Sequence, residues 1–296
     1  MISLSESTPS DAPIAFQGAP GAYSDLACRV VFPDRRTLPC HGFEEALAAA
    51  LDGEAEFAVI PIENSLAGRV ADVHYLLPRS GLHIVGEHFA PVHHHLLALP
   101  GVAIEDIRTV RSHVHALGQC RNLIRALGAQ PQVAADTAGA AAELAKSGDR
   151  QVAVIASELA GRIYGLEALR SNIEDAAHNT TRFVVLSRRP LVPPLAAGGV
   201  YVTSFIFRVR NVPAALYKAL GGFATNGVNM TKLESYMVGG RFTATEFYAD
   251  VEAHPEERRL QLALEELRFF TEEVVVLGTY PAHPFRAKAL EGSLAP

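Results

Sequence analysis

A segment rich in proline and glycine, residues 187–199 (SRRPLVPPLAAGG), divides the chain into two stretches with different hydrophobic patterns. Its three prolines and two glycines interrupt helical and strand periodicity, as a linker does. A chain of 296 residues is also long for one hydrophobic core, because single cores rarely grow far beyond ~150–250 residues. We therefore expect two domains, residues 13–188 and residues 200–280.

Upstream of the linker, short apolar runs alternate with amphipathic stretches. The runs that we expect to be strands are residues 14–17, 58–60, 109–111, 133–135, 152–156 and 182–186. Because stretches with helical spacing follow these runs, the pattern predicts an α/β sheet. Residues 1–12 are polar, and we expect them to form a tail.

Three of the expected helices follow from the spacing of their apolar residues. The first has Leu26, Val30 and Val31 facing inward. The second is capped by Asn64 or Ser65, and the third begins at Ser112. The residues that share the apolar faces of the second and third helices are Leu66, Val70, Val73 and Leu77, and Ala116, Cys120, Ile124 and Leu127.

Several expected helices start with Gly, Asn, Ser or Asp directly after a strand. In α/β sheets ligands lie beyond the carboxyl ends of the strands. Helix N-termini present free N–H groups and a partial positive charge, which suit an anion. For any single position ordinary helix capping is the alternative. Several such starts in one region favour a small anionic ligand.

Downstream of the linker the pattern changes. Residues 201–209 alternate as a strand does, and Pro213 opens a stretch with helical spacing. Residues 228–236 and 243–251 predict a hairpin around Gly239-Gly240, followed by a helix over 255–270 and a strand over 273–277. This order, βαββαβ, is the ferredoxin-like pattern.

The composition argues against several classes of protein. A formal net charge of −6 and a pI of about 6.1 disfavour nucleic acid as the main partner, because phosphate binding needs a basic face. The three cysteines form no CxxC pair and no even-numbered framework, as is typical of free thiols in a reducing compartment. Without a secretory signal or a bilayer-spanning apolar run, we expect a cytoplasmic protein that does not bind membranes.

A metal site is not expected either. Residues 93–95 are three consecutive histidines, but consecutive strand residues point to opposite faces and cannot all ligate one ion. The turn at residues 18–21 also lacks the glycine spacing of a dinucleotide-binding fingerprint.

Four motifs within residues 14–186 resemble those of prephenate dehydratases. They are residues 16–24 (FQGAPGAYS), residues 61–65 (PIENS), Ser112-His113 with Gln119, and residues 179–183 (NTTRF). A lone Thr-Arg-Phe would carry no weight, but four motifs in the family's order and spacing make the resemblance specific. It implies a catalytic domain of two lobes, like the type II periplasmic-binding fold, with lobe boundaries near residues 90 and 170.

The resemblance also implies the reaction, the conversion of prephenate to phenylpyruvate with loss of carbon dioxide and water, without a cofactor or metal. Thr181 is the expected donor to the leaving hydroxyl, although by itself it would be taken for an ordinary strand-end threonine. Arg182 suits bidentate carboxylate binding, and a surface salt bridge is its alternative. Asn64, Ser112 and Gln119 are neutral donors, of which Ser112 has an alternative as a helix cap.

Glu63 has two possible roles in such a site. A neighbouring dianion would raise its pKa and make it an acid near neutral pH, or Glu63 would instead orient Asn64. Phe183 is either a core residue or a substrate contact. The substrate-binding residues that the motifs imply are Tyr23, Ser24, Ser65 and Phe183.

The stretch beyond the linker resembles the ACT domain attached to this family. Residues 229–235 (NMTKLES) match the family's Asn-Leu-Thr-Lys-Ile-Glu-Ser, and Ala214 stands where the family usually has glycine. Tyr236-Met237 replaces the usual Arg-Pro. The resemblance implies phenylalanine as an inhibitory effector, bound between paired domains of a homodimer or a dimer of dimers. Its expected contacts are Ala214, Ala215, Leu216, Asn229, Met230, Glu234 and Ser235.

Two alternatives remain open at this stage. Arogenate dehydratases use the same motifs on a substrate that carries an amine in place of the keto group. A non-enzymatic sensor could also join a two-lobed binding domain to an ACT domain, although the intact Thr181-Arg182-Phe183 run favours an enzyme. No chorismate mutase segment is seen before residue 13, so a monofunctional enzyme is expected.

Overall fold

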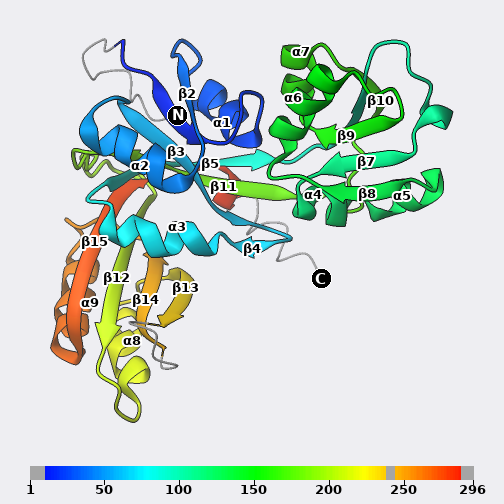
Figure 1. The fold of residues 1–296 in the computed structure, drawn as a ribbon. Coiled ribbons are helices and arrows are strands. Elements are labelled where there is room, and N and C mark those ends of the chain that lie inside the picture. The colour runs from blue at the N-terminus through cyan, green and yellow to red at the C-terminus, as the bar shows by residue number, and fades with distance from the viewer. Residues whose placement is uncertain (1–10, 238–243, 288–296) are drawn as a thin grey trace. The chain divides into compact units, whose positions relative to one another are not determined.

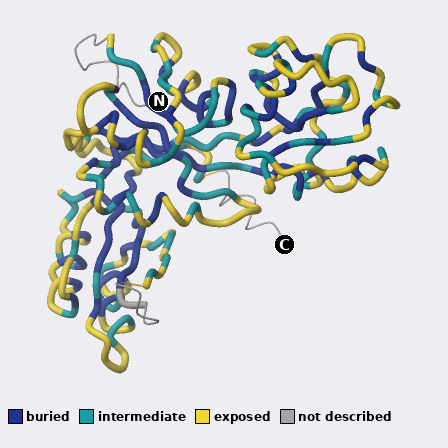
Figure 2. Tube along the Cα trace, viewed as in Figure 1, coloured by how far each residue is buried: buried dark blue, intermediate teal, exposed yellow. Residues whose placement is uncertain are grey.

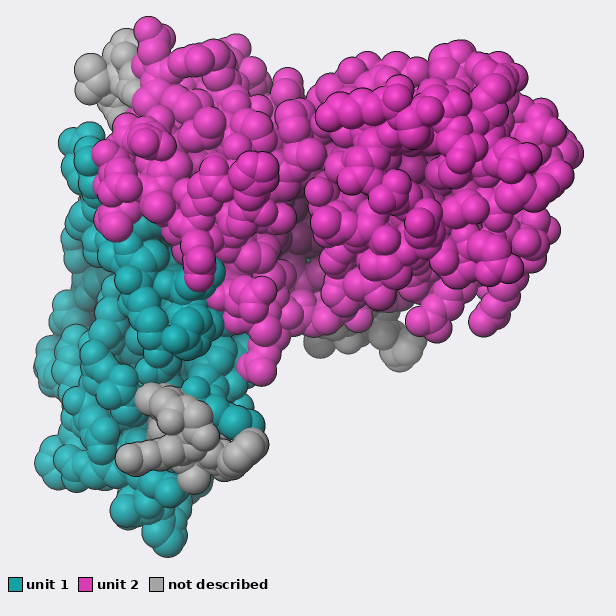
Figure 3. All heavy atoms as spheres, in the orientation of Figure 1, with its two compact units in different colours: residues 1–9, 74–87, 184–296 teal, residues 10–73, 88–183 magenta. Residues whose placement is uncertain are grey.

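The computed structural model describes residues 11–237 and 244–287. Its contacts divide the chain into two units, of which unit 1 comprises residues 1–9, 74–87 and 184–296 (Figure 3). Unit 2 comprises residues 10–73 and 88–183. The expected division into residues 13–188 and 200–280 stays a prediction, since the strands at the junction, β5 (His83–Pro91) and β11 (Thr180–Ser187), run through the boundary.

The first sheet has the strand order β2-β1-β3-β11-β5, with β4 paired to β3 (Figure 1). The bounds of its other strands are β1 (Ile14–Gln17), β2 (Thr37–Cys40), β3 (Phe57–Asn64) and β4 (Gly68–Arg69). Its helices are α1 (Tyr23–Val31), α2 (Phe43–Asp52) and α3 (Ala71–Leu76). β1 pairs in parallel with both β2 and β3. Figure 2 shows the central part of this sheet as buried, and residues 14–16 of β1 and 57–60 of β3 are buried, as expected where helices cover a parallel sheet.

The second sheet has the order β10-β6-β9-β7-β8. Its strands are β6 (His95–Ala98), β7 (Thr109–Ser112), β8 (Gln130–Val133), β9 (Val152–Ala156) and β10 (Glu167–Ser171). Its helices are α4 (Val114–Gln119), α5 (Arg121–Leu127), α6 (Thr137–Ser147) and α7 (Glu158–Tyr164). β7 pairs in parallel with β8 and β9, whereas β6 pairs antiparallel with β9 and β10.

Both sheets follow one plan. In the first sheet β1 lies between β2 and β3, and β11 separates β3 from β5. In the second sheet β7 lies in the same way between β8 and β9, and β6 separates β9 from β10. The chain leaves the first sheet after β5 and returns to it at β11, so the lobes meet near residues 91–95 and 171–180. The predicted two-lobed, periplasmic-binding-like α/β fold is therefore confirmed.

The C-terminal sheet has the order β13-β14-β12-β15. Its elements are β12 (Tyr201–Val209), α8 (Ala215–Thr225), β13 (Met230–Met237), β14 (Ala244–Val251), α9 (Arg258–Phe270) and β15 (Thr271–Pro281). β12 pairs antiparallel with both β14 and β15, and β13 pairs antiparallel with β14, which gives the predicted βαββαβ ferredoxin-like fold. The turn predicted at Gly239-Gly240 lies outside the described residues. Of the predicted linker, residues 187–199, Ser187 is the last residue of β11, and residues 188–199 form no helix or strand.

The core of this sheet shows why alternate residues of β12 and β14 are apolar. Phe205 and Phe207 from β12 and Phe247 from β14 lie on the face that α8 and α9 cover. Phe205 stacks on Phe223 of α8, with ring centroids 5.7 Å apart. Because strand side chains alternate, the other face carries the residues between those of the core, among them the buried Ser204 of β12 and Asp250 of β14.

Three of the expected helices differ in the structure. In α1 Val30 is 63% exposed, and the buried face is instead formed by Ser24, Asp25, Ala27 and Cys28. The physical reason is Asp25, whose Oδ2 accepts from the backbone N–H of Gly21 at 2.8 Å and so turns this polar face inward.

The other two helices start later than expected. The Asn64 side chain accepts from the N–H groups of Leu66 and Ala67, so the chain turns back as β4 and α3 begins only at Ala71. Ser112 ends β7 and is fully buried, and His113 is the N-cap of α4. The single helix expected up to Gly128 is two, α4 and α5, separated at Cys120.

Ala214 is a strained residue at the start of α8. Its φ of 61° lies in the left-handed region, and α8 begins one residue after it rather than at Pro213. A non-glycine residue in this region costs about 1–2 kcal/mol. We therefore expect Ala214→Gly to raise the free energy of unfolding by up to about 1 kcal/mol, after the extra entropy that glycine adds to the unfolded chain.

Urea unfolding followed by circular dichroism measures this change. Ala215→Gly is the matched control, because Ala215 is the first helical residue of α8. This substitution should lower the free energy of unfolding by about 0.5–1 kcal/mol. Destabilisation by Ala214→Gly comparable to that of the control would contradict the strain.

Candidate active site

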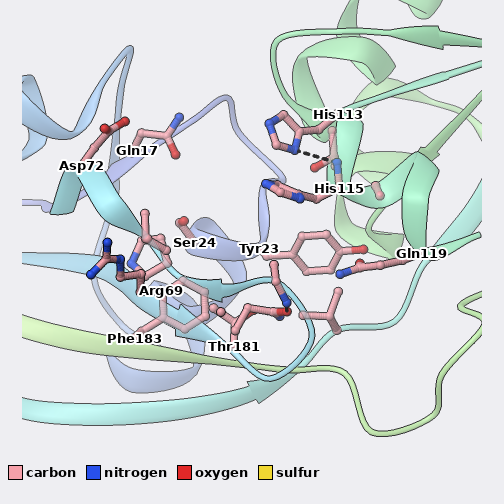
Figure 4. A pocket seen from close by; sticks show the side chains of 18 of the residues that line it. Gln17, Tyr23, Ser24, Arg69, Asp72, His113, His115, Gln119, Thr181 and Phe183 are labelled. Carbon is pink, nitrogen blue, oxygen red and sulfur yellow. Dashed lines mark hydrogen bonds between the residues drawn. The ribbon is translucent and has the colours of Figure 1, made fainter. Parts of the chain in front are cut away.

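A pocket of about 570 Å³ lies within unit 2. Its wall draws residues from both lobes: Thr181 and Phe183 from β11 on one side, and His113, His115 and Gln119 around α4 on the other (Figure 4). The remaining polar lining residues are Gln17, Tyr23, Ser24, Asn64, Arg69, Asp72, His94 and Thr137.

Asn64 is held in one orientation by the backbone around it. Its Oδ1 accepts from the N–H groups of Leu66 at 3.0 Å and Ala67 at 2.9 Å. Its Nδ2 must therefore donate, and it lies 2.8 Å from Asn179 Oδ1 and 3.0 Å from Thr181 Oγ1. The turn that ends β3 thus sets the direction of every hydrogen bond that this amide makes.

Thr181 stands at the pocket wall as an acceptor toward the protein. Because Asn64 Nδ2 donates to Thr181 Oγ1, the hydrogen of the Thr181 hydroxyl remains available to another group. The Thr181 hydroxyl can therefore donate to a leaving oxygen while its own oxygen is held in place by the hydrogen bond from the Asn64 amide.

Gln119 continues this set of hydrogen bonds. Asn179 Oδ1 accepts from Asn64, so Asn179 Nδ2 donates, and it reaches Gln119 Oε1 at 2.9 Å. Gln119 Oε1 also lies 2.8 Å from His94 Nε2. Asn64, Gln119 and Thr181, which the motifs singled out separately, are therefore brought together through Asn179.

Tyr23, the first residue of α1, is the last member of this chain of hydrogen bonds. Its hydroxyl lies 2.7 Å from His94 Nδ1 and 2.8 Å from the carbonyl oxygen of His93. Burial raises the pKa of Tyr23 well above its usual range, so its proton stays in place. Burial lowers the pKa of His94, against the hydrogen bond to Gln119 and the charge of Glu174, which favour protonation.

Four other expected site residues have different surroundings. Ser24 lines the pocket, and Phe183 both lines it and is buried in the core. Ser65 Oγ donates to the carbonyl of His178 and accepts from the N–H of Thr180, so it holds the strand end next to Thr181. Ser112 Oγ donates to the carbonyl of Ile155 at 2.6 Å and does not line this pocket.

Glu63 and Arg182 face each other. Arg182 Nη1 donates to Glu63 Oε1 at 2.8 Å, and the Arg182 side chain is only 2% exposed. Neither residue lines the pocket, although each is the chain neighbour of one that does, Asn64 and Thr181 respectively. The pair joins β3 to β11 directly behind those two residues. Their expected substrate roles stay predictions.

Several lining residues were not expected from the motifs. Arg69 and Asp72 follow the turn that the sequence pattern assigned to a helix, which hid their position at the pocket. His94 lies within the histidine run that was considered only as a metal site. Only His95 of that run is in a strand, and within residues 11–237 and 244–287 no group of three or more His, Cys, Asp or Glu side chains converges to hold a metal.

The expected effector contacts lie in the C-terminal sheet. Ala215, Leu216 and Met230 pack partly buried against the core, and Ala214 is exposed. The outer strand β13 carries Glu234, which contacts Lys232 Nζ at 3.2 Å, and Ser235. Asn229 Nδ2 donates to Glu252 Oε2 at 2.7 Å. Their role in binding stays a prediction.

Stability should fall as the pH is lowered through the ordinary pKa of histidine, 6.5. Burial lowers the pKa of His94, His95 and His113 in the folded chain. Below pH 6.5 the unfolded chain therefore binds more protons than the folded chain, which favours unfolding. We expect the Tm to drop between pH 7.5 and pH 5.5 at constant ionic strength, measured by circular dichroism. A Tm that is constant or rises over this range would contradict neutral buried histidines.

Comparison with known proteins agrees with this geometry. The family model for prephenate dehydratase matches residues 14–191. A bifunctional N-acyl-homoserine lactone acylase/prephenate dehydratase of Komagataeibacter europaeus is 55% identical over 93% of this chain and 98% of its own length. Arogenate dehydratase/prephenate dehydratase 1 of Arabidopsis thaliana is 42% identical over 90% of this chain and 71% of its own.

A solved structure shares the whole architecture. It is the prephenate dehydratase of Arthrobacter aurescens in complex with L-Phe, which superposes with a TM-score of 0.83 at 29% identity and covers 95% of this chain and 99% of its own. Every helix of the described residues is too short or too polar to cross a membrane. The matches indicate an enzyme, so the alternative of a non-enzymatic sensor is wrong. The chain belongs to the prephenate dehydratase family of lyases.

Proposed function

We propose that this chain converts prephenate to phenylpyruvate. The ring carboxylate leaves as carbon dioxide, its bonding electrons enter the ring, and the carbon–oxygen bond to the ring hydroxyl breaks. The departing hydroxide takes one proton to become water, so the dianion and one proton become a monoanion, carbon dioxide and water. The catalyst must bind two carboxylates and stabilise the leaving oxygen.

The observation that carries this proposal is the hydrogen bond from Asn64 to Thr181. It leaves the Thr181 hydrogen to point at the leaving oxygen, and the fixed amide spares the site reorganisation when charge develops there. The amide of Gln119 and the guanidinium of Arg69 line the same pocket and suit the carboxylates. Formation of phenylpyruvate by the purified protein, followed by its absorbance, tests the proposal. No product above the uncatalysed rate would refute it.

Arogenate is the alternative substrate. Asp72 lines the pocket near Arg69 in the chain, and its carboxylate could accept from the ammonium group that distinguishes arogenate from prephenate. The name of the Arabidopsis relative includes both activities. Values of kcat/KM for both substrates decide between them. If Asp72 selects arogenate, Asp72→Asn should lower kcat/KM for arogenate more than for prephenate.

A second candidate activity is the hydrolysis of N-acyl-homoserine lactones, which the name of the Komagataeibacter relative includes. The observation that favours it is the imidazole at the pocket, since burial lowers the pKa of His113 and keeps it available as a base near pH 7. Release of homoserine lactone from such a substrate by the purified protein would support it. Unchanged substrate after prolonged incubation would exclude it.

We propose further that phenylalanine inhibits the enzyme by binding at the C-terminal sheet, in a homodimer or a dimer of dimers. The L-Phe complex of the Arthrobacter enzyme supports this by similarity. The edge strands β13 and β15 expose Leu233, Met237, Val275 and Val276, apolar residues that suit a contact between copies. Ala214 stands in place of the family's glycine and Tyr236-Met237 in place of its Arg-Pro. These replacements affect how strongly phenylalanine binds and inhibits.

Three measurements on the intact protein test this regulation. Light scattering gives the number of subunits, calorimetry gives phenylalanine binding, and an activity titration gives inhibition. Heat without inhibition would mean that phenylalanine binds but that its binding is not coupled to the active site. Neither heat nor inhibition at millimolar phenylalanine would refute the effector, and a monomer would refute the paired site.

A further inference from the structure

The hydrogen bonds around His94 leave only one position where a proton can be gained. The backbone N–H of Leu66 fixes the orientation of the Asn64 amide, which in turn fixes that of the Asn179 amide. Asn179 Nδ2 then donates to Gln119, whose Oε1 must be the acceptor. His94 Nε2 lies 2.8 Å from that oxygen and must therefore carry a hydrogen in every protonation state. The charge of the ring is then decided at Nδ1 alone.

Nδ1 faces the Tyr23 hydroxyl, which has a single hydrogen and two acceptors within reach. With neutral His94, Tyr23 donates either to Nδ1 at 2.7 Å or to the His93 carbonyl at 2.8 Å, but not to both. With a protonated ring, Nδ1–H donates to the Tyr23 oxygen, and Tyr23 donates to the carbonyl. The protonated form alone makes all of these hydrogen bonds.

Burial acts in the opposite direction. His94 is only 2% exposed, and its burial lowers its pKa, so the ring is neutral in the empty pocket near pH 7. The charged or titratable groups that face it are Glu174, which accepts from the His94 N–H at 2.9 Å, Tyr23, and the neighbouring His93 and His95. Cys120 follows Gln119 and keeps its proton, because burial raises its pKa to about 12.

We propose that His94 is a positioning residue that takes up one proton from solvent when the dianionic substrate fills the pocket. This inference rests on the proposed function, because the negative charge of the bound substrate is what favours the imidazolium. The charged ring then holds Gln119 by a charge-assisted hydrogen bond and, through Asn179 and Asn64, holds Thr181 in place. It also adds a positive charge to the pocket that the motifs do not reveal.

The sign of the pH dependence follows by linkage. Below the lowered pKa of the empty site, His94 is protonated with or without substrate, so binding is independent of pH. Above it, binding requires proton uptake and weakens as the pH rises toward the higher pKa of the complex. Opposite charge within about 4–6 Å shifts a pKa by about 1–3 units, so KM should rise about tenfold or more between pH 6 and pH 9.

The test is the KM for prephenate across this pH range in the intact protein. His94→Gln keeps an N–H donor for Gln119 but cannot hold a charge, so we expect a KM about tenfold higher at pH 6 that hardly changes with pH. Tyr23→Phe removes the acceptor for Nδ1–H and should move the rise in KM to lower pH. His41→Gln, on an exposed residue, is the matched control and should follow the wild type.

Outcomes separate this inference from the proposed function. No phenylpyruvate from the wild type refutes the function itself. Normal turnover with superimposable pH profiles of KM for wild type and His94→Gln overturns the role of His94. If His94→Gln does not fold, calorimetry in phosphate and in Tris counts the protons that the wild type takes up when it binds a non-reacting dicarboxylate analogue of prephenate, which keeps both negative charges. Observed heats that differ between the two buffers by the amount that net proton uptake requires support the proposal, and equal observed heats in the two buffers overturn it.

Discussion

Thr181→Ala is expected to lower kcat by about 10²–10³-fold, with a much smaller change in KM. Removing one preorganised donor to a developing negative charge has about this effect in enzymes. The Thr181 hydrogen is available because Asn64 donates to the Thr181 oxygen. The hydrogen bond from Thr181 to the leaving oxygen strengthens only as the carbon–oxygen bond of the substrate breaks, so its loss affects kcat more than KM. Steady-state kinetics with prephenate measure both constants.

Two variants sharpen this result. Thr181→Ser keeps the hydroxyl and should retain most of the activity. Thr180→Ala is the matched control, because Thr180 is the adjacent residue of β11 and contributes its backbone N–H and carbonyl to the contacts with Ser65. If Thr181→Ala kept near-wild-type turnover, the leaving-group role of Thr181 would be wrong.

Arg286→Met is expected to lower the free energy of unfolding by about 3–5 kcal/mol. Arg286 donates to both carboxylate oxygens of Glu87, from Nε at 2.6 Å and from Nη2 at 2.8 Å. Its Nη2 also lies 3.7 Å from Asp250 Oδ2, and the side chains of Glu87 and Asp250 are fully buried. Methionine has a similar length but no charge, so both carboxylates would lose the nearby charge of Arg286 in a site of low dielectric constant.

Urea unfolding of the intact chain measures this loss, and Arg268→Met is its control. Arg268 is exposed in the last turn of α9, where the same substitution should change stability by less than about 0.5 kcal/mol. Arg286→Lys should fall between the two, because lysine keeps the charge but not the paired hydrogen bonds. Equal stability of Arg286→Met and Arg268→Met would mean that Glu87 and Asp250 do not depend on Arg286.

Local sequence patterns were reliable where one interaction dominates. β1 and β9 begin and end where their apolar runs do, and β12 matches its alternating run from Tyr201 to Val209. Asp136 and Ser157 are N-caps of α6 and α7, each accepting from a backbone N–H three residues on. Such runs and caps depend on neighbours in the chain, which is why they can be inferred without the tertiary structure.

The patterns failed where a polar group satisfies a distant or backbone partner. Asp25 turns α1 onto a small polar face, and Asn64 replaces the first turn of an expected helix by a β-turn. Strands β5, β6 and β10 were not expected. For β6 and β10 the reason is that they pair antiparallel, with partners far along the chain on which their register depends.

The order of apolar runs and helical spacings predicted the α/β sheet and the ferredoxin-like domain, and the four short motifs implied the two lobes and the family. The contacts between those motifs, in contrast, could not be inferred before the chain is folded. Asn64, Asn179, Gln119 and His94 are separated by up to 115 residues, yet one chain of hydrogen bonds orients them all. A motif specifies which donors and acceptors are present, whereas the direction of each hydrogen bond depends on what the fold places opposite it.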